Sequence, residues 1–191
     1  MRTGTKPFGP TAIATPANAL TMARLVAAPV FAALIGVVGP SSWVLWSIWT
    51  VLAFSDGLDG HLARRHGTTS SGAFLDPLAD KFLVIAALVA LARLGAVSWV
   101  AVALIAAREV AMSLFRTYAS RRGVSVPARP VAKAKTVVQV VAVGLCLFPP
   151  TAHHLLLTRS VLWAAVAMTL LSGLLYFFDG RRLLGTKPVH P

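Results

Sequence analysis

The sequence predicts an all-α integral membrane protein with six transmembrane helices. Of its 191 residues, 57% are hydrophobic and 13% are charged, whereas a soluble domain carries roughly 25% charged residues. Apolar stretches of about twenty residues recur along the chain, and this length crosses a bilayer. Proline and glycine punctuate the gaps between them. The six predicted spans cover residues 18–38, 42–63, 72–91, 98–118, 131–148 and 161–178.

These spans form one predicted domain. Residues 1–17 are expected to be an N-terminal juxtamembrane segment, residues 18–180 the six-helix domain, and residues 181–191 a basic tail. No period of 20–50 residues repeats, which argues against an internally duplicated transporter. The proline-broken segment before the first span is too long for a typical cleaved signal peptide, so we expect this span to be retained.

The basic residues cluster at alternate connections between the predicted spans. The net charge is +12, and most of it lies before the first span, after the second, around the fourth connection and after the sixth. The positive-inside rule therefore predicts that both termini and both basic connections are cytoplasmic. Such a face attracts anionic membrane lipid. The basic clusters have no interleaved aromatic residues for base stacking, which argues against nucleic-acid binding.

The acidic residues gather in one short region. The chain has six Asp and Glu residues, and four of them fall between Asp56 and Asp80. An aspartate at the centre of a membrane helix costs about 2.5–3.5 kcal/mol. Four such residues facing lipid would cost on the order of 10 kcal/mol, so we expect them to line a polar cavity or bind cations.

Helical spacing divides these acids into two stripes, because positions three and four apart share one helix face. The first stripe comprises Asp56, Asp59, Gly60 and Ala63, and the second comprises Gly72, Asp76 and Asp80. The short link of residues 64–71 predicts that the two helices are antiparallel neighbours. Two carboxylates from each helix would then converge, with small residues leaving space beside them.

Four converging carboxylates cannot all stay ionised unaided. Hard divalent cations such as Mg²⁺ or Mn²⁺ prefer oxygen ligands and would balance this charge. A metal site of this kind stabilises displacement at phosphorus, and Arg64 would add a guanidinium fork suited to phosphate. A cation channel or transporter is the alternative class, but it predicts acids spread over several spans.

The same residues carry a resemblance to a known family. Residues 56–64 read DGLDGHLAR and residues 72–80 read GAFLDPLAD, which is similar to the signature D-x2-D-G-x2-A-R followed by G-x3-D-x3-D of the CDP-alcohol phosphatidyltransferases. Seven residues separate Arg64 from Gly72, one fewer than the spacing most usual in the family. Flanking blocks at residues 18–24, 107–110, 116 and 133–139 resemble the branch that uses glycerol 3-phosphate as acceptor.

The resemblance implies a fold and a site. The expected fold is a homodimeric six-helix membrane protein in the cytoplasmic membrane of a prokaryote, with its active site on the cytoplasmic side. Asp56, Asp59 and Asp76 would ligate Mg²⁺ or Mn²⁺, with two ions per site. Asp80 would be the general base and would also touch the second ion. The pocket for CDP-diacylglycerol would be lined by Gly60, Ala63, Arg64 and Gly72.

The implied reaction transfers a phosphatidyl group from CDP-diacylglycerol to sn-glycerol 3-phosphate and releases CMP. Because this acceptor is an anion, Arg116, Lys133 and Lys135 are candidates for binding its phosphate, with topology signalling as the alternative role for each. The signature does not discriminate the acceptor, so a cardiolipin synthase or an enzyme with another alcohol remains the alternative within the family.

Other polar residues have two open roles each. Arg108 and Glu109, deep in the fourth span, either serve a pocket or form a structural buried pair. Lys81 either modulates the charge of Asp80 or extends to the membrane surface. Thr21 and Arg24 are weaker candidates for contact with the nucleotide.

Overall fold

The computed structural model describes residues 16–66, 70–122 and 130–185, and within them the side chains of residues 22–55, 81–119, 122 and 134–181. This part of the chain is helical throughout its regular structure and contains no strand. The helices are α1 Pro16–Val38, α2 Trp43–His66, α3 Ser70–Arg93, α4 Trp99–Arg121, α5 Pro130–Leu147, α6 Pro149–Ala152 and α7 Leu155–Gly185.

The six long helices coincide with the six predicted spans, so the all-helical prediction is confirmed. Two boundaries differ in an informative way. Helix α2 continues to His66, beyond the predicted end at residue 63, and α7 begins at Leu155, before the predicted start at residue 161. A helix can continue through polar residues and beyond the length that crosses a bilayer, whereas the predicted spans were limited to apolar stretches of that length. The short helix α6 was not predicted; it begins at Pro149, and proline is favoured at the first position of a helix.

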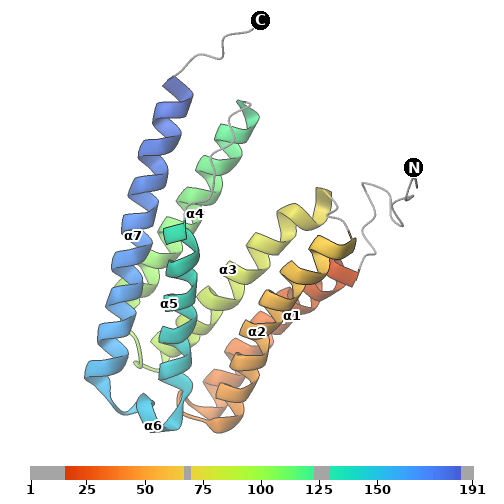
Figure 1. Cartoon of the computed structure of the whole chain (residues 1–191). Coiled ribbons are helices and arrows are strands. Elements are labelled where there is room, and N and C mark those ends of the chain that lie inside the picture. The colour runs from red at the N-terminus through yellow and green to blue at the C-terminus, as the bar shows by residue number, and fades with distance from the viewer. Residues whose placement is uncertain (1–15, 67–69, 123–129, 186–191) are drawn as a thin grey trace, which may run out of the picture.

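The long helices run up and down in one bundle, and both ends of the described chain lie at the same end of it (Figure 1). Helix α1 packs mainly against α3, and α7 packs against α4 and α5, while α3 also contacts α4 and α5. Helix α3 therefore connects the N-terminal helices to the C-terminal ones. A polar group on α3 can consequently meet groups from α4 and α5 inside the bundle.

The core is apolar and continuous across these helices. Phe31 of α1 stacks on Trp49 of α2 with ring centroids 5.8 Å apart. The Trp49 indole N–H donates to the Val140 carbonyl of α5 at 3.1 Å, which satisfies its polar atom. Gly144 lies one turn further along α5, and a Cβ there would be 3.5 Å from the same indole nitrogen. This contact holds α2 against α5.

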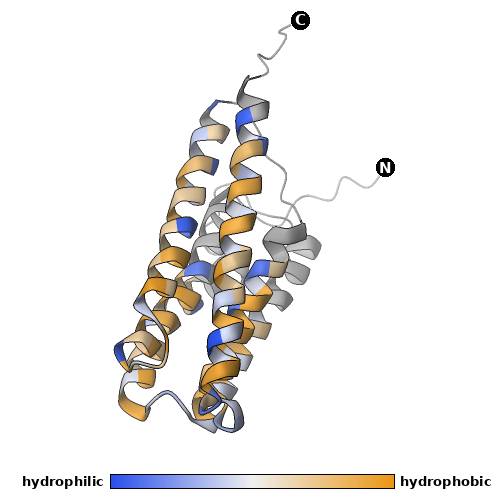
Figure 2. Ribbon diagram, turned by 90° about the vertical axis from the view of Figure 1, so that its left-hand side faces the viewer, coloured by the Kyte–Doolittle hydropathy of each residue, from blue (hydrophilic) through white to orange (hydrophobic). Residues whose placement is uncertain are grey.

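The outer surface is apolar as well. Large exposed hydrophobic side chains occur on every long helix, including Val37, Val51, Leu114, Val137 and Leu156, and hydrophobic residues follow the helices along their length (Figure 2). By length and composition, one helix within the described ranges could cross a membrane by itself, at Leu155–Arg181. Apolar surface of this extent marks an interaction with lipid or with other protein.

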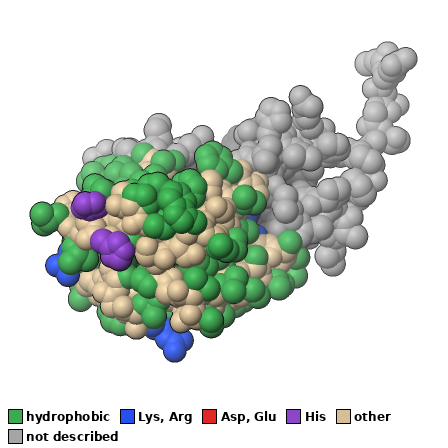
Figure 3. All heavy atoms as spheres, turned by 90° about the horizontal axis from the view of Figure 1, so that it is seen from below, with side chains coloured by type: hydrophobic (Ala, Val, Ile, Leu, Met, Phe, Trp, Pro, Cys, Tyr) green, Lys and Arg blue, Asp and Glu red, His purple; other side chains and the backbone are tan. Residues whose placement is uncertain are grey.

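The two ends of the bundle differ in charge. The ends of α2, α4 and α7 carry arginine pairs, which are Arg64 and Arg65, Arg121 and Arg122, and Arg181 and Arg182. All three helix ends lie at the end of the bundle where α1 begins (Figure 1). At the opposite end hydrophobic side chains predominate and basic ones are sparse (Figure 3). His153 and His154 are exposed there, as expected for solvated histidines on the far face.

Candidate active site

The four clustered aspartates lie on the two helices expected for them. Asp56 and Asp59 belong to the second half of α2, and Asp76 and Asp80 belong to the first half of α3. Only three residues separate His66 from Ser70, so their Cα atoms are at most about 15 Å apart. The carboxylate-bearing ends of the two helices are therefore at the same end of the bundle. The gap between the two helices is shorter than the predicted link of residues 64–71, because α2 ends at His66 and α3 begins at Ser70.

The side chains of this region lie outside those that the structure describes. This applies to the predicted metal ligands and base and to the predicted CDP-diacylglycerol contacts, which are Asp56, Asp59, Asp76, Asp80, Gly60, Ala63, Arg64 and Gly72. Their convergence stays a prediction. Among the described side chains, no group of three or more His, Cys, Asp or Glu residues is arranged to hold a metal. The carboxylate donors themselves are of the type that Mg²⁺ and Mn²⁺ prefer.

A buried arginine reaches the edge of this region from α1. Arg24 is 3% exposed, and its Nη2 lies 3.4 Å from the Ser55 hydroxyl oxygen. Ser55 directly precedes Asp56 on α2 and donates its own hydrogen bond to the Leu52 carbonyl at 2.8 Å. The cation of Arg24 is therefore positioned beside the start of the first aspartate stripe. The side chain of Thr21 lies outside the described ones.

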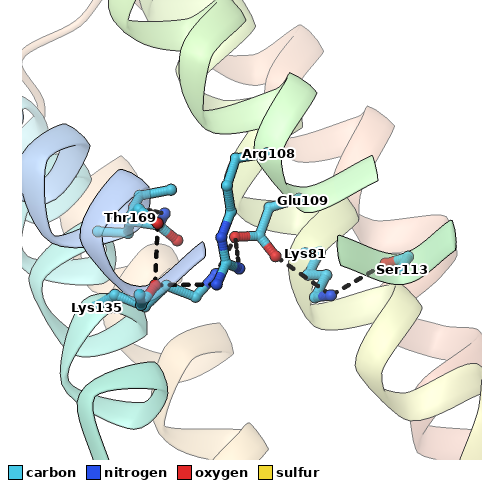
Figure 4. A network of polar contacts seen from close by, with 8 residues as sticks. Lys81, Arg108, Glu109, Ser113, Lys135 and Thr169 are labelled. Carbon is cyan, nitrogen blue, oxygen red and sulfur yellow. Dashed lines mark hydrogen bonds and ion pairs between the residues drawn. The ribbon is translucent and has the colours of Figure 1, made fainter. Parts of the chain in front are cut away.

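A second polar centre lies inside the bundle around Glu109 of α4, which is 3% exposed. Its Oε1 accepts hydrogen bonds from Arg108 Nη1 at 2.9 Å and from the ammonium of Lys135 on α5. Its Oε2 lies 3.2 Å from the Lys81 ammonium of α3. Figure 4 shows these cations approaching one carboxylate from three helices.

Hydrogen bonds extend the centre to α7. Arg108 Nη2 donates to the Ser172 hydroxyl at 2.9 Å, and that hydroxyl donates to the Thr169 carbonyl at 3.0 Å. Gln139 of α5 donates to the Thr169 hydroxyl at 2.8 Å. Lys81 also donates to the Ser113 hydroxyl at 3.2 Å. Because buried polar groups need partners, this network fixes how α3, α4, α5 and α7 meet.

The network borders a cavity of about 120 Å³, which has room for several waters or one small polar molecule. Its lining residues come from α3, α4, α5 and α7: Lys81, Val84, Arg108, Glu109, Met112, Arg116, Lys135, Thr136, Gln139 and Tyr176. Four of these are cations and one is an acid, so the lining has a formal excess of positive charge. A small anion is the ligand class that this lining favours.

Arg116 and Tyr176 form the wall of the cavity nearer the ends of α4 and α7. The Arg116 guanidinium carbon lies 5.8 Å from the Tyr176 ring centroid, within the range of a cation–π contact. Tyr176 is 8% exposed, and among the described residues its hydroxyl has no hydrogen-bond partner. An unpaired buried hydroxyl beside a polar cavity is a candidate contact for a ligand.

The structure brings together two of the three predicted acceptor residues. Arg116 and Lys135 line the same cavity, whereas the side chain of Lys133 lies outside the described ones. Both roles left open for Arg108 and Glu109 occur together, because the two residues pair at 2.9 Å and also line the cavity. Lys81 extends to Glu109 and Ser113.

Sequence reasoning missed Tyr176 and the central position of Glu109. Tyr176 occurs in an apolar helix and reads as an ordinary core or interfacial aromatic. The one available signal was the depth of Glu109 in the fourth span, since an intramembrane acid is normally functional and paired. The sequence did not show that partners at positions 81 and 135 would reach it.

The fold and these two polar regions define a class of protein: an apolar helical bundle with an acid-rich pair of helices adjoining a basic cavity. The chain belongs to the CDP-alcohol phosphatidyltransferase family, whose sequence model matches residues 14–181. The resemblance seen in the signature residues is thereby confirmed, and it covers nearly the whole helical bundle.

Bacterial relatives carry names from one branch of this family. The chain is 38% identical over 178 residues to a probable phosphatidylglycerophosphate synthase of Mycobacterium tuberculosis (strain ATCC 25618 / H37Rv), which covers 91% of this chain and 85% of that protein. It is 34% identical over 166 residues to a CDP-diacylglycerol–glycerol-3-phosphate 3-phosphatidyltransferase of Rickettsia bellii, covering 84% and 92%. A Bacillus subtilis protein with the same name is 32% identical over 190 residues, covering 89% and 97%.

Proposed function

We propose that this protein transfers the phosphatidyl group of CDP-diacylglycerol to sn-glycerol 3-phosphate, giving phosphatidylglycerol phosphate and CMP. The observation that carries the proposal is the basic cavity at Glu109, which adjoins the aspartate-bearing helix α3 and suits a small anionic acceptor. The names of the relatives in M. tuberculosis, R. bellii and B. subtilis support the same reaction. The family to which the chain belongs supports the donor.

The donor is expected at the aspartate stripes of α2 and α3. Asp56, Asp59 and Asp76 would hold Mg²⁺ or Mn²⁺, with two ions per site, and Asp80 would contact the second ion. When bound, the metal would neutralise charge on the diphosphate and on the departing CMP. Arg64 would bind the diphosphate, and Gly60, Ala63 and Gly72 would leave room for the nucleotide beside the helix backbones. Arg24 supplies a further buried cation at this edge.

Asp80 would act as the general base. It would take the proton of the primary hydroxyl of glycerol 3-phosphate as that oxygen forms its bond to the phosphorus bearing diacylglycerol. The bond between this phosphorus and the CMP oxygen breaks, and CMP leaves. Asp80 immediately precedes Lys81 on α3, whose ammonium lies at the cavity. The proposed base and one wall of the cavity therefore belong to the same helix.

The cavity would bind the acceptor's phosphate. Arg116 and Lys135 are its proposed ligands, with Lys133 as a further one. The Arg116 guanidinium carbon lies 5.8 Å from the Tyr176 ring centroid, and a guanidinium fork matches the geometry of a phosphate. Lys135 shares one carboxylate oxygen with Arg108, and its ammonium has three N–H groups. Counting the contacts among the described side chains, donors therefore remain for a ligand.

The six long helices would each cross the membrane, with both termini and the active site on the cytoplasmic side of a bacterial plasma membrane. The start of α1, the end of α7 and the arginine-rich helix ends share one end of the bundle, which supports this topology. The cavity lies toward that same end, because Arg116 and Tyr176 are nearer the C-terminal ends of α4 and α7. A homodimer is also expected, and light scattering of the purified protein would measure it.

An acceptor panel tests the proposed reaction. Purified protein in detergent would receive CDP-diacylglycerol with Mg²⁺ or Mn²⁺ and one of glycerol 3-phosphate, phosphatidylglycerol, inositol phosphate or serine. We expect CMP release and a new lipid product with glycerol 3-phosphate. CMP release with phosphatidylglycerol alone would instead make the protein a cardiolipin synthase. No CMP release with any acceptor would overturn the enzyme assignment.

A further inference from the structure

Glu109 is the one acid that the described part of the chain contributes to a cavity whose other charged lining residues are all cations. A carboxylate is an unexpected component of an anion-binding site, because it repels the ligand. If positive charge were the only requirement, the cavity would bind an anion more tightly with a neutral residue at position 109. The presence of Glu109 therefore needs another explanation.

The contacts of Glu109 suggest one. Its two oxygens hold three cations that come from three different helices: Arg108 of α4, Lys135 of α5 and Lys81 of α3. Lysine and arginine side chains have several rotatable bonds, and ordering each one has a substantial entropic cost. Three buried cations without a central anion would also repel one another. Glu109 removes that repulsion and restricts all three side chains to one arrangement.

Within the described part of the chain, the arrangement leaves donors unused. Arg108 is held at both terminal nitrogens, by Glu109 and by Ser172. Lys135 donates to Glu109, and Lys81 donates to Ser113 while facing Glu109. Each ammonium carries three N–H groups, so both lysines retain donors for a ligand. Donors that are fixed before the ligand arrives bind it at a smaller entropic cost.

We propose that Glu109 is a positioning residue, which fixes Lys81 and Lys135 so that their free donors form a single preorganised site for the phosphate of the acceptor. This inference rests on the proposed function, since it assigns the cavity to an anionic acceptor. It also connects the two parts of the site. Because Lys81 follows Asp80, the Glu109–Lys81 ion pair fixes α4 against α3 at the residue next to the base.

A positioning role for Glu109 predicts that removing its charge weakens acceptor binding, whereas simple electrostatic repulsion predicts tighter binding. Glu109→Gln keeps the side-chain length but removes the charge and one acceptor oxygen. We expect the KM for glycerol 3-phosphate to rise by about tenfold or more, because hydrogen bonds to charged groups are lost from the ordered site. The kcat should fall, and the KM for CDP-diacylglycerol should stay within about twofold. Glu109→Asp keeps the charge but withdraws the oxygens, and should give an intermediate acceptor KM.

Thr158→Val is the matched control for a buried polar substitution. Thr158 is buried on α7, and its hydroxyl lies 3.3 Å from the backbone carbonyls of His154 and Leu155, away from the cavity. This variant should leave all three kinetic parameters unchanged. The melting temperature of each variant in detergent would be measured beside its kinetics. If Glu109→Gln does not fold, Glu109→Asp carries the same comparison.

Two results would overturn the inference. A lower acceptor KM in Glu109→Gln would show that the carboxylate only repels the ligand. A lower melting temperature with wild-type KM values would show that it only holds the helices together. Inhibition by inorganic phosphate probes the anion site directly. Its result does not depend on which alcohol is the acceptor, so it can be distinguished from a failure of the proposed reaction. Phosphate should inhibit the wild-type protein and should inhibit Glu109→Gln about tenfold more weakly.

Discussion

The Lys81 ammonium lies 3.2 Å from Glu109 Oε2, so a residue that directly follows the aspartate signature on α3 is paired with the middle of α4. This pair is mostly buried and belongs to a cluster with more cations than acids. Buried charges are stable only when they are paired and hydrogen-bonded. The pair therefore connects the acid-rich helices to the basic cavity by a contact that has structural and electrostatic consequences.

The Tyr176 hydroxyl, which has no hydrogen-bond partner among the described residues, gives a prediction about stability. A buried donor without a partner costs about 1–3 kcal/mol, so Tyr176→Phe should raise the melting temperature of the ligand-free protein in detergent. The chain has two tyrosines, and Tyr118 is the matched control. It is 47% exposed and also has an arginine near its ring, with the Arg122 guanidinium carbon 4.8 Å from the centroid. Tyr118→Phe should not change the melting temperature.

Gly173 of α7 gives a prediction about Arg108. A Cβ at this position would be 3.1 Å from Arg108 Nε, and Arg108 cannot move away without lengthening its bonds to Glu109 and Ser172. Gly173→Ala should therefore raise the KM for glycerol 3-phosphate by about threefold to tenfold, with donor KM unchanged. Gly36 of α1 has no atom within 4 Å of its Cβ position. Gly36→Ala should keep wild-type kinetics, and an unchanged acceptor KM in Gly173→Ala would contradict the assigned role of Arg108.

Gly180, one helical heptad beyond Gly173, concerns packing instead of binding. A Cβ at Gly180 would clash with the ring of Phe115, and Phe115 packs edge-on against Tyr176 with centroids 6.0 Å apart. Gly180→Ala forces this ring to move, and overpacking typically costs about 1–3 kcal/mol. We expect a lower melting temperature in detergent. A wild-type melting temperature would show that α4 and α7 are further apart here than the structure has them.

Removal of metal tests the proposed role of the aspartates as ligands. Chelation by EDTA should abolish CMP release, and added Mg²⁺ or Mn²⁺ should restore it. Asp59→Asn should prevent restoration at metal concentrations that saturate the wild-type protein. Asp179 lies on α7, outside the signature, so Asp179→Asn should be restored normally. Full activity in EDTA would contradict a metal-assisted reaction.

The fold was largely predictable because hydropathy and chain breaks act locally. The glycines at positions 39 and 95 were predicted breaks, and both have positive φ values of 95° and 72° at the ends of α1 and α3, where glycine is favoured. Helix α6 was missed because a proline pair reads as a simple break. The start of α7 was missed because Thr158, Arg159 and Ser160 are polar and interrupt the apolar run before Val161.

The site was only partly predictable. The aspartate signature has a fixed local spacing, so it can be read from the sequence. The Glu109 centre depends on residues 81, 109 and 135, whose separations of more than twenty residues contain no local signal. Tyr176 became a candidate only when its hydroxyl was found buried beside a cavity. Long-range packing decides these contacts, and a single sequence does not encode them in a pattern that can be read.

The most direct test of the account is CMP release by Asp80→Asn, with CDP-diacylglycerol, glycerol 3-phosphate and Mg²⁺ at concentrations that saturate the wild-type protein. Loss of a general base lowers the rate by about 10²–10⁴-fold. We predict a loss of this size in a variant that folds and still binds CDP-diacylglycerol. CMP release within about twofold of the wild-type rate would contradict the claim that this carboxylate activates the acceptor.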